Sequence, residues 1–552
     1  MEPHGARTRL LSFERRPRCP CAKRSVSELA GERDIFDPGV AYTCSTGRLG
    51  AAQFKSDDSK KGGWVSHACK APKTVVLLLM QMIEEIVTQI SQALWGLPTV
   101  AMLGFVGLLY TVRSRFFQFR RFGTVWKSTF GALLKRGDKQ ESRSAFKAMA
   151  TALGGTIGIG NIAGVATAIV AGGPGAIFWM WISGFAGMMT KLAEVCLAVT
   201  YRRTDKEGVH YGGPMYYMLD GLGRRFKPLA LLFAVFCVLA SFGIGSMTQV
   251  NSVAESLQDA FGVPRLAVGV AILVLVMLVV CGGIKRISNF TGVFVPFMAI
   301  FYLVFALWVI AANRAQLPTA FADIFTSAFG LKQAAGGVAG FTVARAVSAG
   351  VSRGVFTNEA GMGSAPIAHA SSDVKDPLSQ GMWGVVEVFL DTIVVCTMTA
   401  LVALTSDAYR GGAGLDGVSL TTAAFEEVLG GFGGKFVAIS VTLFAFATVL
   451  GWAYYGEAAV KFLTGERRWP SYVYKALFSG AILVGAVANL GLVWNLADIF
   501  NGLMILPNIL ALVLLYPVVI DQIDRMDGRL PRKGRPRRFP RRWGGDLPDR
   551  NT

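Results

Sequence analysis

Apolar runs of about 20 residues alternate with short polar segments through most of the chain. As an α-helix, a run of that length crosses the ~30 Å hydrocarbon core of a bilayer. The pattern predicts an all-α polytopic membrane protein with eleven spans. The expected spans are 93–112, 147–171, 176–201, 229–256, 266–283, 291–311, 336–364, 382–404, 436–455, 474–488 and 492–518.

Two of the expected spans are interrupted by glycine. Segments 154–175 (GGTIGIGNIAGVATAIVAGGPG) and 336–363 (GGVAGFTVARAVSAGVSRGVFTNEAGMG) are membrane-type sequence, yet each holds enough glycine and polar residues to stop a helix. Lipid cannot satisfy the backbone groups that such a break frees, so each break must line a cavity enclosed by protein. A pair of broken helices in two halves of a chain points to the substrate and ion site of a secondary transporter.

The positions of the breaks predict an internal repeat. If the first span is peripheral, the other ten form two sets of five that each open with a broken helix, and the odd number inserts the sets with opposite polarity. The fold class expected is an inverted 5+5 helix repeat preceded by one peripheral transmembrane helix. The expected divisions are 1–82, an N-terminal extension; 83–146, the peripheral helix and a basic loop; 147–313, the first repeat; 314–520, the second repeat; and 521–552, a basic tail.

Basic residues predict the orientation. The loop 113–147 and the tail 521–552 are rich in Lys and Arg, so both are expected on the cytoplasmic side. The formal net charge of +19 is explained by such loops and tails, and nucleic acid is therefore not an expected partner.

The polar extension 1–82 does not follow this distribution of basic residues, because it is basic and yet would lie on the outer side of the membrane. Two interpretations remain open: a disordered extension, or a natural start near Met80 or Met82, which we favour. Cys19 and Cys21 begin a metal-ligand pattern that no second close pair completes, so no metal other than sodium is expected.

The first break suits a zwitterion and a cation together. In TIGIGN (156–161), helix N–H groups freed at Gly158, Gly160 and Asn161 attract a carboxylate, and unwound carbonyls near Thr156 attract a cation. The alternative for glycines in this region is close packing between helices.

In the second break, Ser348 and Gly350 are expected to supply the facing backbone. Arg345 and Arg353 flank them, and an intramembrane arginine needs a partner or water because its burial costs at least ~2.5 kcal/mol. Glu359 is the expected partner of Arg353, in a gating or structural ion pair.

Long motifs give the chain a resemblance to a known family, the sodium/alanine symporters, also called the alanine or glycine:cation symporter family. The resemblance extends from about residue 83 to the eleventh span. The motifs that carry it are GGTIGIGNIAGVATAIVAGGPGAIFWMW (154–181), YGGPMYYM (211–218), SRGVFTNEAGMGSAPIAHA (352–370), DTIVVCTMTALV (391–402) and GWAYYGE (451–457).

The resemblance implies a multi-pass protein of the bacterial inner membrane whose last ten helices adopt the leucine-transporter fold. It also implies sodium-coupled uptake of alanine or glycine. A small neutral L-amino acid, sodium ion and the lipid bilayer are thus the expected partners; sodium is the coupling ion, no other cofactor is expected, and the oligomeric state stays open.

The resemblance also places polar residues of two other spans at the site. Gln249 is expected to bind the ammonium or carboxylate of the substrate. Thr448 is expected to offer a hydroxyl oxygen to sodium; alternatively, this hydroxyl bonds a carbonyl of its own helix. Trp452 lies one turn later on the same face and is expected to cap the space for the substrate side chain; alternatively, it is an anchor at the membrane interface.

Independently of the resemblance, Asp391 in the eighth span is a functional hypothesis, because a carboxylate is costly there. It is expected either to bind sodium together with Thr397 or to balance the charge of Arg345, and the sequence leaves both open.

Enzymatic function is not expected, because the chain has no P-loop, no HExxH and only dispersed histidines. An ion channel also uses carbonyl-lined breaks, and a proton-coupled symporter would use Asp391 as the titrating group. The sequence therefore predicts a sodium-coupled symporter for a small neutral amino acid, with these two alternatives.

Overall fold

The computed structural model describes residues 82, 85–91, 93–134, 139–330, 339–412, 414–488 and 490–531. Two units divide the chain, Met1–Lys70 and Ala71–Thr552, and the second contains all the described residues. The expected extension 1–82, apart from residue 82, and the part of the basic tail after residue 531 lie outside them.

Helices make up the regular structure of the described residues, apart from one short hairpin. Its strands β1 (Arg203–Thr204) and β2 (His210–Tyr211) are antiparallel and pair Arg203 with Tyr211. The all-α prediction is therefore confirmed for this part of the chain.

Seven of the described helical segments are long and apolar enough to cross a membrane, so the protein is a multi-pass membrane protein. They are α8 (Gly175–Thr200); η3 (Arg224–Phe226) with α10 (Lys227–Phe242), η4 (Gly243–Met247) and α11 (Thr248–Phe261); α13 (Gly283–Ala312); α17 (Pro377–Val388) with η7 (Phe389–Cys396) and α18 (Thr397–Leu404); α21 (Gly431–Leu463); α22 (Trp469–Val487); and α23 (Leu490–Met526).

The other four expected spans coincide with helices that are shorter or interrupted. These are α2 (Leu97–Arg113), α12 (Arg265–Val280) and the two broken helices, α6 (Lys139–Thr156) with α7 (Ala163–Gly172) and α15 (Ala339–Asn358) with α16 (Ala365–His369). The count of eleven spans and the inverted repeat stay predictions.

The first break has the predicted position. Helix α6 ends at Thr156, the 3-10 turn η1 (Ile159–Asn161) follows, and α7 begins at Ala163. Gly158 is extended, with φ −133° and ψ −157°, and its N–H donates to Asn161 Oδ1 at 3.0 Å. A side chain thus replaces the helical partner that this N–H would otherwise need.

The second break lies further along the chain than predicted. Helix α15 continues without interruption to Asn358, and the chain turns between there and Ala365, where Glu359, Gly361 and Gly363 have φ of 54°, 92° and 81°. The prediction of a break around Ser348 and Gly350 is wrong, because these two residues lie inside regular helix.

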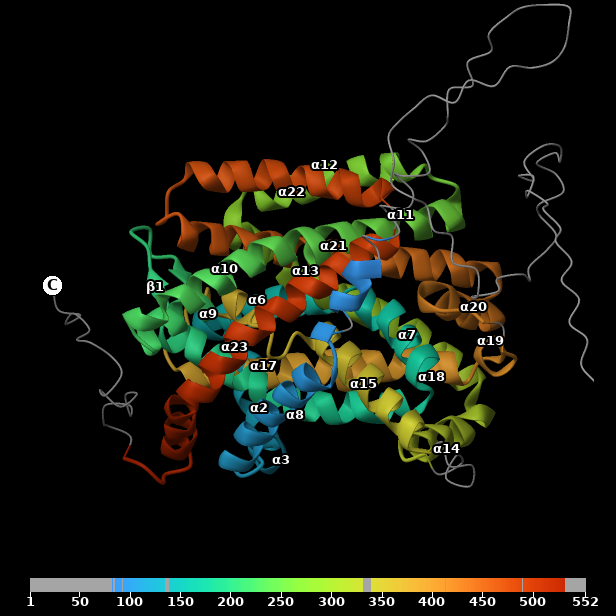
Figure 1. Ribbon diagram of the computed structural model, residues 1–552, viewed down its shortest axis with the longest axis horizontal. Helices are drawn as coiled ribbons and strands as arrows, with labels where there is room; N and C mark the ends of the chain where they lie inside the picture. Colours follow the sequence, from blue (N-terminus) through green and yellow to red (C-terminus); the bar gives the residue numbers. More distant parts are fainter. Residues whose placement is uncertain are drawn as a thin grey trace, which may run out of the picture. The chain divides into compact units, whose positions relative to one another are not determined.

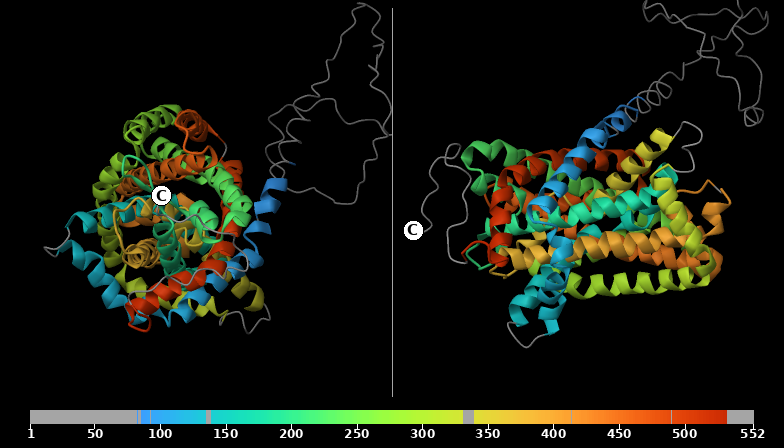
Figure 2. Two further views of the ribbon diagram at one scale, coloured as in Figure 1. Left: turned by 90° about the vertical axis from the view of Figure 1, so that its left-hand side faces the viewer. Right: turned by 90° about the horizontal axis from the view of Figure 1, so that it is seen from below.

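Helices α8 and α21 are the most enclosed of the long spans. Within their most apolar windows 83% and 78% of residues are buried, against 33% for α13, so α13 offers most of its surface to lipid. Most long helices run roughly along one direction or its reverse, and α12 and α22 lie side by side at one edge (Figures 1 and 2).

The first span is fastened to α23, in keeping with a peripheral position. Tyr110 donates its hydroxyl to the Leu512 carbonyl at 2.8 Å, and Trp95 Nε1 donates to the Asp498 carbonyl at 2.9 Å. Phe105 and Leu108 on the same helix stay exposed, as expected for side chains that face lipid.

Several short helices occupy segments in which the sequence predicted no span. They are α3 (Phe117–Arg120), α4 (Phe122–Ser128), α5 (Phe130–Leu134), α9 (Pro214–Tyr216), the π-helical turn η2 (Tyr217–Gly221), η5 (Arg314–Gln316), α14 (Leu317–Ala328), α19 (Asp407–Arg410) and α20 (Gly417–Leu429). Their length is below that of a membrane span, so a search for long apolar runs does not find them.

Candidate substrate and ion site

Asn161 connects the first break to η7. Its Oδ1 accepts the Gly158 N–H, and its Nδ2 donates to Asp391 Oδ1 at 2.7 Å. The other Asp391 oxygen accepts the Thr392 hydroxyl at 3.0 Å. These side chains have no exposed surface, so the polar cluster is held entirely by protein. The structure thus brings two predicted site residues, Asn161 and Asp391, into direct contact.

The Thr448 hydroxyl of α21 lies among three carbonyl oxygens. Its Oγ1 is 3.2 Å from Gly154 O, 3.3 Å from Ile157 O and 3.2 Å from Phe444 O. The Gly158 N–H donates to Asn161 instead of to Gly154, and the break leaves the Gly154 carbonyl to Thr448. Carbonyl and hydroxyl oxygens gathered at the break in this way are the ligand types that suit a hard cation.

Thr156 lies beside this donor set, where the sequence predicted a sodium ligand. The side chain is 4% exposed and its hydroxyl donates to the Leu153 carbonyl at 3.1 Å, within α6. The hydroxyl oxygen keeps a lone pair for a further partner.

Gln249 reaches the first break from the start of α11. Its Oε1 accepts the Ile159 N–H at 3.4 Å, and its Nε2 donates to the Ile244 carbonyl in the π-helical turn η4 at 3.1 Å. A Cβ added to Gly158 would lie 2.6 Å from Thr448 Oγ1 and 3.2 Å from Gln249 Oε1. Glycine at this position therefore lets the backbone approach both side chains.

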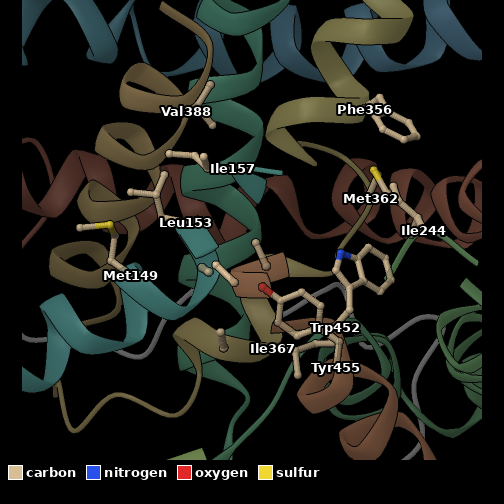
Figure 3. Close-up of a cluster of buried hydrophobic side chains, with 14 of the residues drawn as sticks. Met149, Leu153, Ile157, Ile244, Phe356, Met362, Ile367, Val388, Trp452 and Tyr455 are labelled. Carbon is tan, nitrogen blue, oxygen red and sulfur yellow. The ribbon is translucent and has the colours of Figure 1, made fainter. Parts of the chain in front are cut away.

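Trp452 connects α21 to the second break. Its Nε1 donates to Glu359 Oε1 at 2.8 Å, and Ser364 donates its hydroxyl to Glu359 Oε2. Trp452 and Tyr455 lie together in a buried cluster with Ile244 and Met362 (Figure 3). Trp452 is thus a buried residue and not an anchor at the membrane interface.

The predicted ion pair between Arg353 and Glu359 is wrong for this conformation. Glu359 takes its hydrogen bonds from Trp452 and Ser364, while the Arg353 guanidinium lies over the Phe356 ring, 5.6 Å from its centroid. Glu359 follows the end of α15 with a left-handed backbone, φ 54°, so it does not continue the helix that carries Arg353.

Three other residues expected at the second break have different surroundings. Ser348 is exposed on α15. A Cβ on Gly350 would lie 2.2 Å from the Ala176 carbonyl oxygen, so the glycine allows α15 and α8 to pack closely. Arg345, also expected there, is exposed on α15. The structure does not bring Ser348, Gly350 or Arg345 to the cavity described below.

Thr397 is likewise placed apart from Asp391 and Thr448. Its hydroxyl accepts the Trp181 Nε1–H at 2.8 Å, and the side chain is half-buried. It follows η7, the π-helical stretch of this span, in which the wider turn changes the direction of later side chains. The expectation that Thr397 joins the other sodium ligands is wrong for this conformation.

The two breaks, α21 and the η4–α11 segment enclose one small cavity of about 10 Å³, near the volume that holds the centre of one water molecule. Among the residues that line this cavity, Glu359 is the one with a carboxylate. Three of the lining residues, Gly155, Ile244 and Phe356, could not be predicted from the sequence, because apolar residues that line a cavity have the same sequence pattern as residues of the core. The lining residues are Gly155, Thr156, Gly158, Gly160, Ile244, Gln249, Phe356, Glu359, Thr448 and Trp452.

A second, larger cavity of about 800 Å³, here called the vestibule, lies between α7, α11, α15, α20, α21 and α23. Phe356 of the small cavity stacks on Trp494 of the vestibule, with ring centroids 5.6 Å apart and planes at 26°. This pair of rings lies between the two spaces. The charged residues of the vestibule are Glu255, Asp259, Arg353, Asp416, Glu426 and Asp498.

Comparison with curated proteins finds relatives along most of the chain. An uncharacterized transporter of Haemophilus influenzae is 44% identical over 446 residues, 80% of this chain and 95% of its own length. The sodium/alanine symporter AgcS of Methanococcus maripaludis is 43% identical over 79% of this chain and 96% of its own length. The probable sodium/glutamine symporter GlnT of Bacillus subtilis is 39% identical over 81% and 91%.

Among solved structures, a manganese transporter of Eremococcus coleocola is similar with a TM-score of 0.47 and 13% identity, covering 70% of this chain and 80% of that one. That likeness is too weak to define the fold. The family model described as the sodium:alanine symporter family matches residues 80–538. The chain therefore belongs to the sodium:alanine symporter family.

Proposed function

We propose that this chain is a sodium-coupled symporter that imports a small neutral L-amino acid, alanine or glycine, across the inner membrane of a bacterium. The observation that carries the proposal is the convergence of both helix breaks on one buried cavity, with Gly158 from the first break, Glu359 from the second and Thr448 and Trp452 from α21. Broken helices at membrane depth are where secondary transporters hold their substrates and ions.

The substrate carboxylate would take the N–H groups at the start of η1. The Ile159 N–H now donates to Gln249 Oε1 at the long distance of 3.4 Å, and an anion offers it a stronger acceptor. Gln249 is then free to turn its amide toward the substrate. The Trp452 ring limits the space left for the substrate side chain.

Sodium would lie between the Thr448 oxygen and the carbonyls that this hydroxyl now contacts, with the hydroxyl keeping its proton and turning a lone pair toward the ion. The Gly154 and Ile157 carbonyls and the Thr448 oxygen would be its protein ligands. The partial negative charge at the C-terminus of α6 favours a cation at this point. The relatives named as sodium symporters support sodium as the ion.

Asp391 and Asn161 are proposed as a second place for a cation. Asp391 has no exposed surface, and the polar hydrogens of Asn161 and Thr392 are its hydrogen-bond partners. A buried carboxylate without a full counter-charge attracts a cation strongly. A cation here would also fix Asn161 and thereby the extended backbone at Gly158.

Transport would proceed by alternating access. The vestibule is lined by the part of α7 beyond the first break and by the end of α11, which lie outside if the basic loops and the C-terminus are cytoplasmic. The stacked rings of Phe356 and Trp494 would part to admit the substrate from the vestibule.

The test is uptake of labelled alanine and glycine into proteoliposomes that hold the purified protein. Uptake above the external concentration with an inward sodium gradient, lost when potassium replaces sodium, is the result expected. Thr448→Val should lose sodium-driven uptake, because it removes one oxygen and keeps the volume. Thr442→Val is the matched control, since Thr442 lies on the same helix and donates its hydroxyl to the Ala438 carbonyl within that helix.

Equal uptake with either cation would reject sodium coupling. The burial of Asp391 favours proton coupling as the second candidate, and uptake driven by a pH gradient without sodium would establish it. A conductance that does not saturate with substrate would identify a channel instead.

A further inference from the structure

The hydrogen bond between Trp452 and Glu359 joins two elements that belong to different parts of the chain. Trp452 lies in the middle of α21 and Glu359 follows the last residue of α15, yet their side chains meet at 2.8 Å. Exposure is 0% for Trp452 and 1% for Glu359, so neither side chain reaches bulk water. A buried indole N–H without an acceptor is unfavourable, which makes Glu359 the natural anchor of this ring.

The backbone fixes the position of the Glu359 carboxylate. Glu359 has φ of 54°, a left-handed conformation that is uncommon for a residue with a side chain. Its N–H still donates to the Val355 carbonyl at 2.8 Å, and its carbonyl accepts the Met362 N–H at 3.2 Å. Ser364 donates to the carboxylate oxygen that Trp452 leaves. Both carboxylate oxygens are therefore occupied, one by each donor.

Apart from the indole N–H, the Trp452 side chain interacts with its neighbours through van der Waals packing. A Cβ on Gly245 would lie 2.4 Å from Trp452 Cβ, so the π-helical turn η4 presses on the base of the side chain. The Tyr455 ring packs edge-on at 5.5 Å between centroids (Figure 3). These contacts set where the side chain begins, and the bond to Glu359 sets where the ring points.

The direction of this ring decides how much space the cavity has. With Trp452 bonded to Glu359 the cavity measures about 10 Å³, and both side chains line it. Alanine already needs some enlargement, and each further methylene on the substrate needs more. A ring released from Glu359 could turn away and leave that space.

We propose that Glu359 is a positioning residue that sets the upper size limit of the substrate by holding the Trp452 indole across the cavity. The inference rests on the proposed function. Glu359 acts here as a hydrogen-bond acceptor, and its negative charge is not required. The proposal separates Glu359 from a residue that binds the substrate ammonium, for which the charge would be essential.

Four variants separate these roles. Glu359→Gln keeps an acceptor for the indole, Glu359→Met keeps the length without an acceptor, and Trp452→Phe removes the donor. Trp179→Phe is the matched control, because it removes an indole bond to the Ala328 carbonyl at 3.1 Å, far from the lining of the cavity.

The measurement is inhibition of labelled alanine uptake in proteoliposomes by glycine, alanine, valine, leucine and glutamine. The readout is the ratio of the inhibition constant for leucine to that for alanine, with the KM and maximal rate for alanine measured beside it. Glu359→Met and Trp452→Phe should each lower the ratio by about tenfold or more, the scale of one hydrogen bond to a charged group. Glu359→Gln and Trp179→Phe should keep the ratio of the unmodified protein.

The double variant Glu359→Met with Trp452→Phe should lower the ratio no further than either single change, since both remove the same bond. An unchanged ratio in Trp452→Phe overturns the proposal, and this variant decides if Glu359→Met does not fold. Loss of alanine uptake in Glu359→Gln, with a raised KM, would also overturn it and assign Glu359 to the substrate ammonium.

The unmodified protein in the same vesicles keeps the two proposals apart. Without sodium-driven uptake of a small neutral amino acid in that sample, the proposed function fails. Normal uptake there, combined with size ratios that the variants leave unchanged, rejects the positioning role alone.

Discussion

Lys191 of α8 and Glu387 of α17 form an ion pair with 3.3 Å between Nζ and Oε1, and neither side chain has any exposed surface. His369 Nε2 is 2.7 Å from the other Glu387 oxygen. Glu194 lies three residues further along α8 and has other partners. Glu194 accepts instead from Asn508 Nδ2 at 2.6 Å and from the Gly361 N–H at 3.1 Å.

This ion pair should matter for stability more than for transport chemistry. Lys191→Met leaves the Glu387 charge buried without its cation, so we expect a loss of about 3–5 kcal/mol. Lys191→Met combined with Glu387→Gln should recover most of it, because the remaining amide still accepts from His369. Thermal unfolding in detergent measures both. A double variant as unstable as the sum of the single ones would contradict this account.

Gly158 should tolerate no side chain. Gly158→Ala places a Cβ 2.6 Å from Thr448 Oγ1, so we expect sodium-driven uptake to fall to background while the protein still folds. Gly164→Ala is the matched control, since nothing lies within 4 Å of its added Cβ. Uptake and size-exclusion profiles of the two variants check the prediction, and equal uptake would remove Gly158 from the site.

Gly350 should behave as a packing residue. Gly350→Ala drives a Cβ toward the Ala176 carbonyl of α8, and we expect a destabilisation of about 1–3 kcal/mol. Ser348→Ala on the same helix should change stability little, because Ser348 is exposed. Thermal unfolding distinguishes the two. A variant of Gly350 with normal stability and a raised KM for alanine would restore its predicted role in binding.

The stacked rings should control access from the vestibule. In a cysteine-free background, Thr167→Cys in the vestibule should react with a membrane-impermeant maleimide added outside intact cells, whereas Ile244→Cys in the small cavity should react slowly. Adding Trp494→Ala removes one ring of the stack, and we expect it to speed labelling of Ile244→Cys about tenfold, the scale of a lost aromatic contact in a buried place. Labelling of Thr167→Cys only from the inside would reverse the orientation.

The seven long apolar spans and the first break could be predicted because each depends on local sequence. A long apolar run has few alternatives in a membrane protein, and the glycine and asparagine of TIGIGN lie beside one another. The second break could not be located in the same way. Gly350 and Gly354 resemble hinge residues, but added Cβ atoms there would meet Ala176 and Ser183 of α8.

Several residues of the candidate site could be predicted from the sequence, but the contacts between them could not. Asn161 and Asp391, like Glu359 and Trp452, are distant in the chain, and only the packing of the helices brings them together. Thr397 was misplaced because a π-helical stretch lies before it, and hydropathy does not distinguish a π-helix from an α-helix.

The small size of the closed cavity also limits what the empty protein can carry across the membrane. A site of about 10 Å³ holds almost no solution when no substrate is bound. A change of conformation in that state carries hardly any water or dissolved salt from one side of the membrane to the other. A cell that keeps many copies of this protein would then exchange little solution through the empty ones.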